Sequence, residues 1–206
     1  MKLKGIVIKT TPYKDSDLMV TLLTKEGVVG FKAKGVRKLN SKNRPLVQLF
    51  SYIEAEFFRK GEKLYLINGK HIVSTRKFFA TYTGLIFIQL VSELLERFAL
   101  DEEKTKVFDD LEKAIVEVNE MPDDCDSQEI ILKHLYHLIL LITEECGYSP
   151  REYFKDTVLN TYVEKYLTLE GELPSLTKRE RYKLLREFII FIETAADMTL
   201  ESVELV

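Results

Sequence analysis

The hydrophobic pattern of this chain changes its period close to residue 75, and this change constrains the fold more than any other feature. Before it, β-branched and aromatic residues gather in short runs separated by turn-forming clusters such as TPYKDS and RKGE. The runs cover residues 3–10, 17–24, 28–36, 49–58 and 63–73. Because no segment between them is long enough for a helical crossover, we predict an antiparallel sheet or a small closed barrel.

From Arg76 onward the apolar residues recur with the period of a helix. Helices are predicted over residues 76–100, 102–120, 127–145 and 150–168, and from Thr177 to about residue 195. Thr177 and Glu180 have the spacing of a capping box. The sequence therefore predicts an α+β, multi-domain chain in which residues 1–75 form a five-stranded domain and residues 76–206 form an all-helical domain.

The formal charge of −3 conceals a strong division between the two halves of the chain. Residues 1–80 contain 17 Lys and Arg against 6 Asp and Glu, whereas residues 81–206 contain 13 against 27. A basic half in an acidic chain indicates an anionic partner for that half, or docking of the two halves on each other.

The sequence also bears on the compartment. No run approaches the ~18 apolar residues that a membrane span needs, and the N-terminus turns polar too soon for a signal peptide. The two cysteines, Cys125 and Cys146, are too few for a disulfide framework or a four-thiolate zinc site. We therefore expect a cytoplasmic protein with reduced thiols and no contact with a membrane.

The basic half contains a stretch without acidic residues, AKGVRKLNSKNRP. Its cations are Lys34, Arg37, Lys38, Lys42 and Arg44. In the run before it, alternation places Val29, Phe31 and Ala33 on one face and Lys32 and Lys34 on the other, next to this stretch. These cations can neutralise the phosphates of a nucleic acid, but a solvated surface connection without function has the same composition.

Aromatic residues of the same half can stack on the bases of a single strand. The candidates are Tyr13, Phe31, Phe50, Tyr52, Phe57, Phe58 and Tyr65. Core packing is the alternative for each of them, because bulky side chains fill the interior of a small barrel.

Motifs of catalysis are missing from the sequence. It contains no Walker loop, no GxGxxG and no GxSxG, so we expect neither an enzyme nor a cofactor. His134 and His137 lie three residues apart on a predicted helix and could supply two ligands to a metal-dependent hydrolase. Their apolar neighbours favour packing in a helical bundle instead, and no metal site is predicted.

Five motifs follow one another in the N-terminal domain: VIKT at Val7 to Thr10, PYKDSD at Pro12 to Asp17, TKEG at Thr24 to Gly27, AKGVR at Ala33 to Arg37 and YIEAE at Tyr52 to Glu56. In sequence and in order they resemble the RecO family of bacterial recombination mediators. The later segment LKHLYHLILLITEECGYSP resembles the helical domain of that family more weakly.

The resemblance implies an N-terminal OB-fold barrel and a helical C-terminal domain. It also implies binding to single- and double-stranded DNA, strand annealing, and loading of the RecA recombinase at the nucleoid of a bacterial cell. The implied partners are RecR and the C-terminal tail of the single-strand DNA-binding protein. The basic barrel face of the family maps onto Lys32, Lys34, Arg37 and Lys38, whereas Lys42 and Arg44 match in charge alone.

The chain departs from the family after Gly147-Tyr148-Ser149-Pro150. Many members carry paired cysteines there, but REYFKDTVLNTY follows here, so no zinc finger is expected. For the acidic, apolar-ended tail, the basic start of the last predicted helix offers a site, formed by Lys178, Arg179, Arg181, Lys183 and Arg186. A solvated helix face is the alternative for these residues. For the whole chain the alternative is a protein-interaction scaffold whose barrel docks on a partner protein rather than on DNA.

Overall fold

The computed structural model describes residues 1–98, 105–122, 127–169 and 172–202. The chain divides into two compact units, and each is described here by itself. The first comprises Met1–Ala80 with Ala99–Cys125, and the second comprises Thr81–Phe98 with Asp126–Val206. That residues 1–75 form a domain alone stays a prediction, since the helix after residue 104 belongs to the same unit as the strands.

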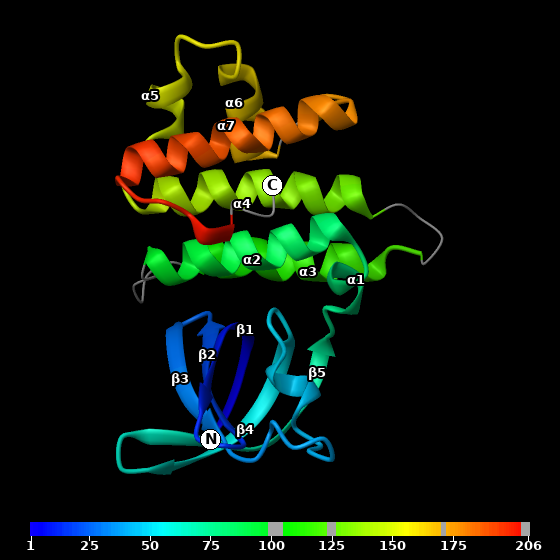
Figure 1. The fold of residues 1–206 in the computed structure, drawn as a ribbon, viewed down its shortest axis with the longest axis vertical. Coiled ribbons are helices and arrows are strands. Elements are labelled where there is room, and N and C mark those ends of the chain that lie inside the picture. The colour runs from blue at the N-terminus through cyan, green and yellow to red at the C-terminus, as the bar shows by residue number, and fades with distance from the viewer. Residues whose placement is uncertain (99–104, 123–126, 170–171, 203–206) are drawn as a thin grey trace. The chain divides into compact units, whose positions relative to one another are not determined.

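The first unit contains a closed barrel of five strands (Figure 1). The strands are β1 (Lys2–Tyr13), β2 (Asp17–Thr24), β3 (Gly27–Ala33), β4 (Tyr52–Lys60) and β5 (Lys63–Val73). They close in the order β1-β2-β3-β5-β4, with β3 and β5 parallel and the other neighbours antiparallel. This arrangement is that of the OB-fold, and it confirms the predicted five-stranded barrel.

The barrel interior is filled by the apolar side chains that alternate along the strands. Phe31 and Ala33 of β3 are buried, as the alternation predicts, and Val29 is partly buried against the same core. The rings of Phe31 and Phe57 meet edge to face with centroids 4.8 Å apart. Phe50 is also fully buried, so these three aromatic residues serve packing rather than base stacking.

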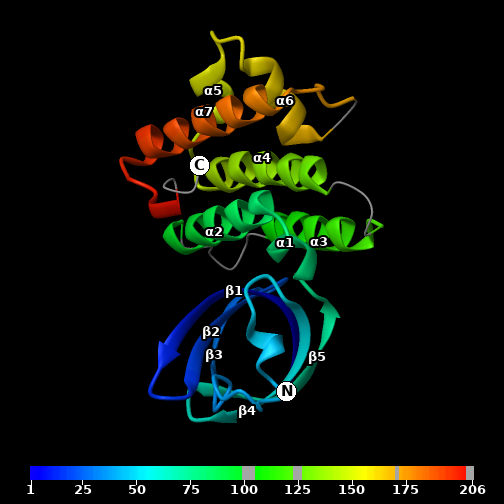
Figure 2. The same cartoon turned by 45° about the vertical axis from the view of Figure 1, so that its right-hand side comes forward.

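The connection between β3 and β4 plugs one end of the barrel. It contains the 3₁₀ helix η1 (Pro45–Val47), whose Leu46 and Val47 join the barrel core. Figure 2 shows η1 within the ring formed by the curving strands. The predicted third strand, residues 28–36, is too long, because β3 ends at Ala33. Gly35 has a φ of +64°, which residues other than glycine adopt rarely, and it turns the chain out of the sheet.

Helix α3 (Thr105–Glu120) packs against the barrel wall, and the short helix α1 (Arg76–Phe79) packs against α3. The ring of Phe108 meets that of Tyr52 edge to face with centroids 6.2 Å apart. Burial, followed by the neighbouring carboxylate of Glu112, raises the pKa of Tyr52. Lys25 in the β2–β3 turn forms an ion pair of 3.1 Å with Asp109. The helix therefore covers Tyr52, which the sequence had offered as a stacking residue.

The second unit is all-helical. Its helices are α2 (Tyr82–Arg97), α4 (Gln128–Glu145), α5 (Pro150–Phe154), α6 (Asn160–Thr168) and α7 (Lys178–Ala196). Helix α4 is its centre, since it contacts each of the other four. Within the described ranges, no helix is both long and apolar enough to cross a membrane.

Two of the predicted helices are interrupted. Residues 76–100 were predicted as one helix, but the chain breaks after α1, where Thr81 becomes extended and its side chain accepts a hydrogen bond from the backbone N–H of Gly84. Residues 150–168 divide into α5 and α6, because the chain leaves the helix after Phe154 and the Thr157 hydroxyl donates to the Phe154 carbonyl. In both places a threonine hydroxyl bonds to the backbone, which competes with a continuous helix.

Candidate nucleic-acid interface

A row of side chains crosses the outer surface of the barrel from β2 to β4. Met19 pairs with Lys32, Lys32 with Tyr65, and Tyr65 with Phe58 in the registers of three neighbouring strand pairs. Phe58 is 43% exposed and Met19 39% exposed, although both are apolar. Large apolar side chains that gather on a surface indicate a contact site.

Lysines lie over the aromatic rings of this row. The Lys34 Nζ is 4.8 Å from the centroid of Tyr65, and the Tyr65 ring stacks on Phe58 with centroids 4.9 Å apart. At the end of β1, Tyr13 lies under the Lys32 Nζ at 4.2 Å. We call these residues the aromatic–lysine face; they are Tyr13, Met19, Lys32, Lys34, Phe58 and Tyr65. Rings for stacking beside cations for phosphates are what a single-stranded nucleic acid requires.

Lys32 is less available than its outward position suggests. Its Nζ lies 2.9 Å from Asp17 Oδ2, and both side chains are about 15% exposed. Asp17 Oδ1 accepts a hydrogen bond of 2.9 Å from the backbone N–H of Gly35. The Lys32 ammonium, and then the Gly35 N–H, lower the pKa of the Asp17 carboxyl, while Asp17 raises the pKa of Lys32. That Lys32 contacts DNA stays a prediction. In the structure its charge is neutralised by Asp17.

The basic loop, residues 34–44, is fastened on two sides. The Arg37 backbone N–H donates to the Ser16 carbonyl at 3.0 Å, and its side chain donates to the Lys14 carbonyl at 3.3 Å. On the other side, the Asn43 side-chain amide donates to the Ile67 carbonyl at 3.0 Å. Between these points the chain makes successive turns. The side chains of Lys34, Arg37, Lys38, Lys42 and Arg44 are all exposed.

The loop and the aromatic–lysine face are joined at Lys34. This residue follows β3 directly, belongs to the loop, and covers Tyr65 with its ammonium. The structure thus combines the cations that the sequence singled out with aromatic rings on the outer surface of the barrel, which the sequence analysis did not distinguish from rings of the core. Strand alternation in the sequence could have distinguished them. Phe58 and Tyr65 alternate with Phe57, Leu64 and Leu66, which are buried, so their side chains point to the outer face.

The basic residues of α7 divide into two groups. Lys178, Arg179, Lys183 and Arg186 are exposed, and the last three follow each other at helical spacing along one stripe that continues to the 42% exposed Ile190. Arg181 lies apart from this stripe. Its guanidinium donates to the Leu176 carbonyl at 2.9 Å and pairs with Glu129 at 3.1 Å. Arg181 therefore ties α7 to α4, whereas the other four are accessible to a partner.

The two histidines considered for metal binding are both buried on α4. His137 Nδ1 lies 2.7 Å from the Tyr166 carbonyl oxygen, a contact within the helical unit. Among the described residues, no three His, Cys, Asp or Glu side chains gather in a way that could hold a metal ion. Of the two cysteines, Cys146 is half-buried and Cys125 lies outside the described residues.

Comparison with known proteins gives a consistent result for the barrel. Residues 1–76 match the sequence profile of the family described as "Recombination protein O N terminal". The chain is similar to the DNA repair protein RecO of Mesoplasma florum, with 30% identity over 125 residues, which are 58% of this chain and 47% of that protein.

Two further relatives carry the same name. The DNA repair protein RecO of Bacillus subtilis is 30% identical over 125 residues, or 59% of this chain and 49% of that protein. The one of Streptomyces coelicolor is 39% identical over 81 residues, or 39% of this chain and 32% of that protein. The matched part of the chain thus spans a third to a half of the length of these relatives.

Proposed function

We propose that the chain acts in DNA repair as a recombination mediator, because its residues 1–76 match the profile of RecO N-terminal domains and the chain is similar to DNA repair proteins RecO. It binds single- and double-stranded DNA through the barrel and the basic loop, and it assists annealing of strands and loading of the RecA recombinase. The proposal assigns no chemical reaction to the chain and places it in the bacterial cytoplasm, at the nucleoid.

The continuity of the basic loop with the aromatic–lysine face carries this proposal. Lys34 lies over Tyr65, and Tyr65 stacks on Phe58, so cations and rings form one surface. In OB-folds generally, the face of the second and third strands is the usual site for oligonucleotides. The cations supply affinity by releasing counterions from the DNA, and the rings supply stacking that is independent of sequence.

The partners belong to the same proposal. We assign the exposed stripe of Arg179, Lys183 and Arg186 to the acidic tail of the single-strand DNA-binding protein, with Ile190 for its apolar end. RecR is the second proposed partner. A chain that binds DNA on its barrel and this tail on α7 would act on strands covered by the single-strand DNA-binding protein. These are the strands on which the recombinase is loaded.

The test of DNA binding is a salt titration of the full chain. If five phosphate contacts form on single strands, log affinity falls against log salt with a slope of about −3.5. Reversal of Lys34, Arg37 and Lys38 to Glu removes three contacts, so the slope should flatten to about −1.4 as binding weakens. Fluorescence anisotropy with labelled single-stranded DNA measures both values.

The control keeps the same change in net charge but lies on helices. Reversal of Lys106, Lys113 and Lys133 to Glu should leave the slope close to that of the original chain. An equal slope for the loop variant and the original chain would remove the basic loop from the interface. If the original chain bound no DNA at all, the alternative of a scaffold that docks on a partner protein would replace the proposal.

A further inference from the structure

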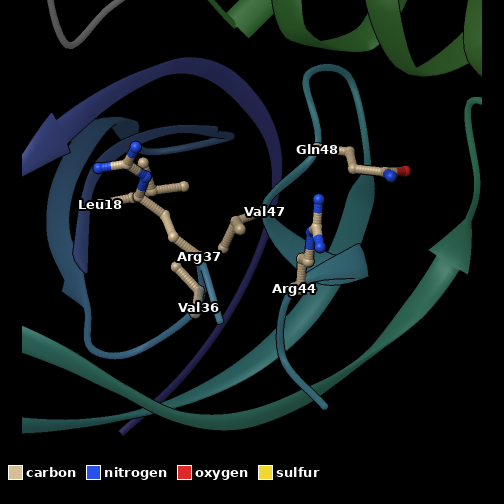
Figure 3. A pocket seen from close by; sticks show the side chains of 6 residues that line it. All are labelled: Leu18, Val36, Arg37, Arg44, Val47 and Gln48. Carbon is tan, nitrogen blue, oxygen red and sulfur yellow. The ribbon is translucent and has the colours of Figure 1, made fainter. Parts of the chain in front are cut away.

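A pocket of about 320 Å³ opens where the basic loop meets the barrel end (Figure 3). Its lining comes from the start of β2, from the beginning of the basic loop, and from η1 with the residues beside it. The lining residues are Leu18, Val36, Arg37, Arg44, Val47 and Gln48. Arg37 and Arg44, which the sequence offered for phosphate contact, thus lie beside apolar side chains in one pocket.

The floor of the pocket is apolar and its sides are polar. Val36 is 1% exposed and Val47 5% exposed, and both belong to the barrel core. Figure 3 shows Arg37 and Arg44 on opposite sides of Val47, with Gln48 beyond Arg44. Among the described residues that line the pocket, none is acidic. Two guanidinium groups beside an apolar floor can bind a ligand that has both an anionic group and an apolar face.

The backbone around the pocket and the Arg37 side chain are held in place before any ligand binds. The hydrogen bonds of Arg37 to the Ser16 and Lys14 carbonyls fix one side. On the other side, the backbone N–H groups of Val47 and Gln48 donate to the carbonyls of Arg44 and Pro45 in η1. A site of this kind costs less ordering on binding than a mobile loop.

We infer that this pocket binds one unstacked nucleotide of a single-stranded DNA. The base contacts Leu18 and Val47 and stacks against a guanidinium plane. Arg37 and Arg44 bind the adjoining phosphate, and the Gln48 amide bonds to the base edge. The volume is at the lower end of the range for small-ligand pockets, which suits one nucleotide rather than a longer segment.

This inference rests on the proposed function and gives it a preference for single strands. A base in a duplex is stacked and paired, and taking it out costs free energy that a single strand does not spend. An acidic peptide could also place a carboxylate on the two arginines. The nucleotide is favoured because the pocket is continuous with a loop of further exposed cations, Lys38 and Lys42, which can follow a strand of phosphates.

The experiment uses the full chain and a short single-stranded oligonucleotide that contains aminopurine, an adenine analogue whose fluorescence rises when the base leaves its stack. Anisotropy reports affinity and emission reports unstacking. The variants are Arg44→Gln and Gln48→Ala, and the matched control is Lys42→Gln, which removes one charge from the same loop outside the pocket. The original chain should raise the emission on binding.

Loss of hydrogen bonds to a charged group should make Arg44→Gln weaken single-strand binding about tenfold. Its effect on a duplex of the same sequence should be only several-fold, as for loss of one counterion contact. Gln48→Ala should reduce the rise in emission. Lys42→Gln should weaken both DNA forms equally, by several-fold, and keep the rise.

Four results would overturn the inference. Binding without a rise in emission, or equal losses of affinity for Arg44→Gln and Lys42→Gln, would show that the chain binds DNA but that this pocket binds no nucleotide. An acidic, phenylalanine-ended peptide that Arg44→Gln no longer binds, while that variant keeps its DNA affinity, would assign the pocket to a protein. Absence of any DNA binding by the original chain would end both the proposed function and this inference.

Discussion

Lys32 and Asp17 form an ion pair of 2.9 Å on the outer surface of the barrel, between β3 and the start of β2. The pair lies beside Tyr13, and Asp17 also accepts the backbone N–H of Gly35 at the entrance to the basic loop. One carboxylate therefore both holds the loop and neutralises a cation of the proposed DNA surface. Asp17 therefore holds the basic loop in place but makes Lys32 less available to a DNA phosphate.

Asp17→Asn should separate the two roles. The asparagine oxygen can still accept the Gly35 N–H, while the Lys32 ammonium loses its counterion and becomes available to a phosphate. We expect single-strand affinity to rise several-fold and the salt slope to become steeper by about 0.7, the value of one additional contact. Anisotropy titrations at several salt concentrations measure this change. A weaker binding of Asp17→Asn would mean that Lys32 does not reach the DNA.

The same variant predicts a pH dependence of stability. The pKa of Asp17 is lowered below its ordinary value of 3.8, chiefly by Lys32 and then by the Gly35 N–H, so the pair stabilises the folded state above that pH. Its contribution is lost as the pH falls through the lowered pKa, where the folded carboxylate takes up a proton. The original chain should therefore melt above Asp17→Asn at pH 7, and the two melting temperatures should converge as the pH falls below 3.8. A constant difference across this range would contradict the role of the pair.

Tyr65 offers a test of stacking that is separate from charge. Its ring contacts the Lys34 ammonium and the Phe58 ring, and loss of a stacking ring costs about 1–3 kcal/mol per base. Tyr65→Ala should weaken single-strand binding about tenfold without flattening the salt slope, because no cation is removed. Tyr65→Phe keeps the ring and should bind as the original chain does. Equal losses in the two variants would assign the effect to the hydroxyl instead of to stacking.

The sequence predicts the parts of this molecule that depend on local pattern. Alternation in VVGFKAKG places Phe31 and Ala33 inside and Lys34 outside, as in the structure. The capping box predicts the start of α7, where Thr177 accepts from the Glu180 backbone and Glu180 accepts from that of Thr177. Each of these features is decided by residues that are neighbours along the chain.

The relationships that organise the candidate site depend on closure of the barrel. Tyr65 comes beside Lys32 only because β5 pairs in parallel with β3, a pairing between segments far apart in the sequence. Alternation places Lys32 and Lys34 on one face, but in the structure Lys32 forms an ion pair with Asp17, whereas the Lys34 ammonium lies over the Tyr65 ring. In the same way, Arg181 looks equivalent to Arg179 in the sequence, but Glu129 on another helix gives it a structural contact.

The stripe on α7 should bind an acidic peptide that ends in phenylalanine. Reversal of Arg179, Lys183 and Arg186 to Glu places like charges against the peptide, so we expect calorimetry to detect no binding. Arg181→Gln should keep the binding but lose about 1 kcal/mol of stability, because its bonds to Leu176 and Glu129 are broken. Retained affinity in the triple variant, with a melting temperature like that of the original chain, would place the peptide on another surface.

Helix α3 should be part of the folding unit of the barrel. Phe108 is 1% exposed and packs on Tyr52, and removal of a buried phenylalanine side chain costs about 3–5 kcal/mol. Phe108→Ala should therefore destabilise the barrel itself, with faster amide hydrogen exchange in β4 as well as in α3. Lys113→Ala, an exposed position on the same helix, is the control and should change stability by no more than about 0.5 kcal/mol. Faster exchange in α3 with unchanged protection of β4 would show that the barrel folds without this helix, as the prediction of residues 1–75 as a separate domain requires.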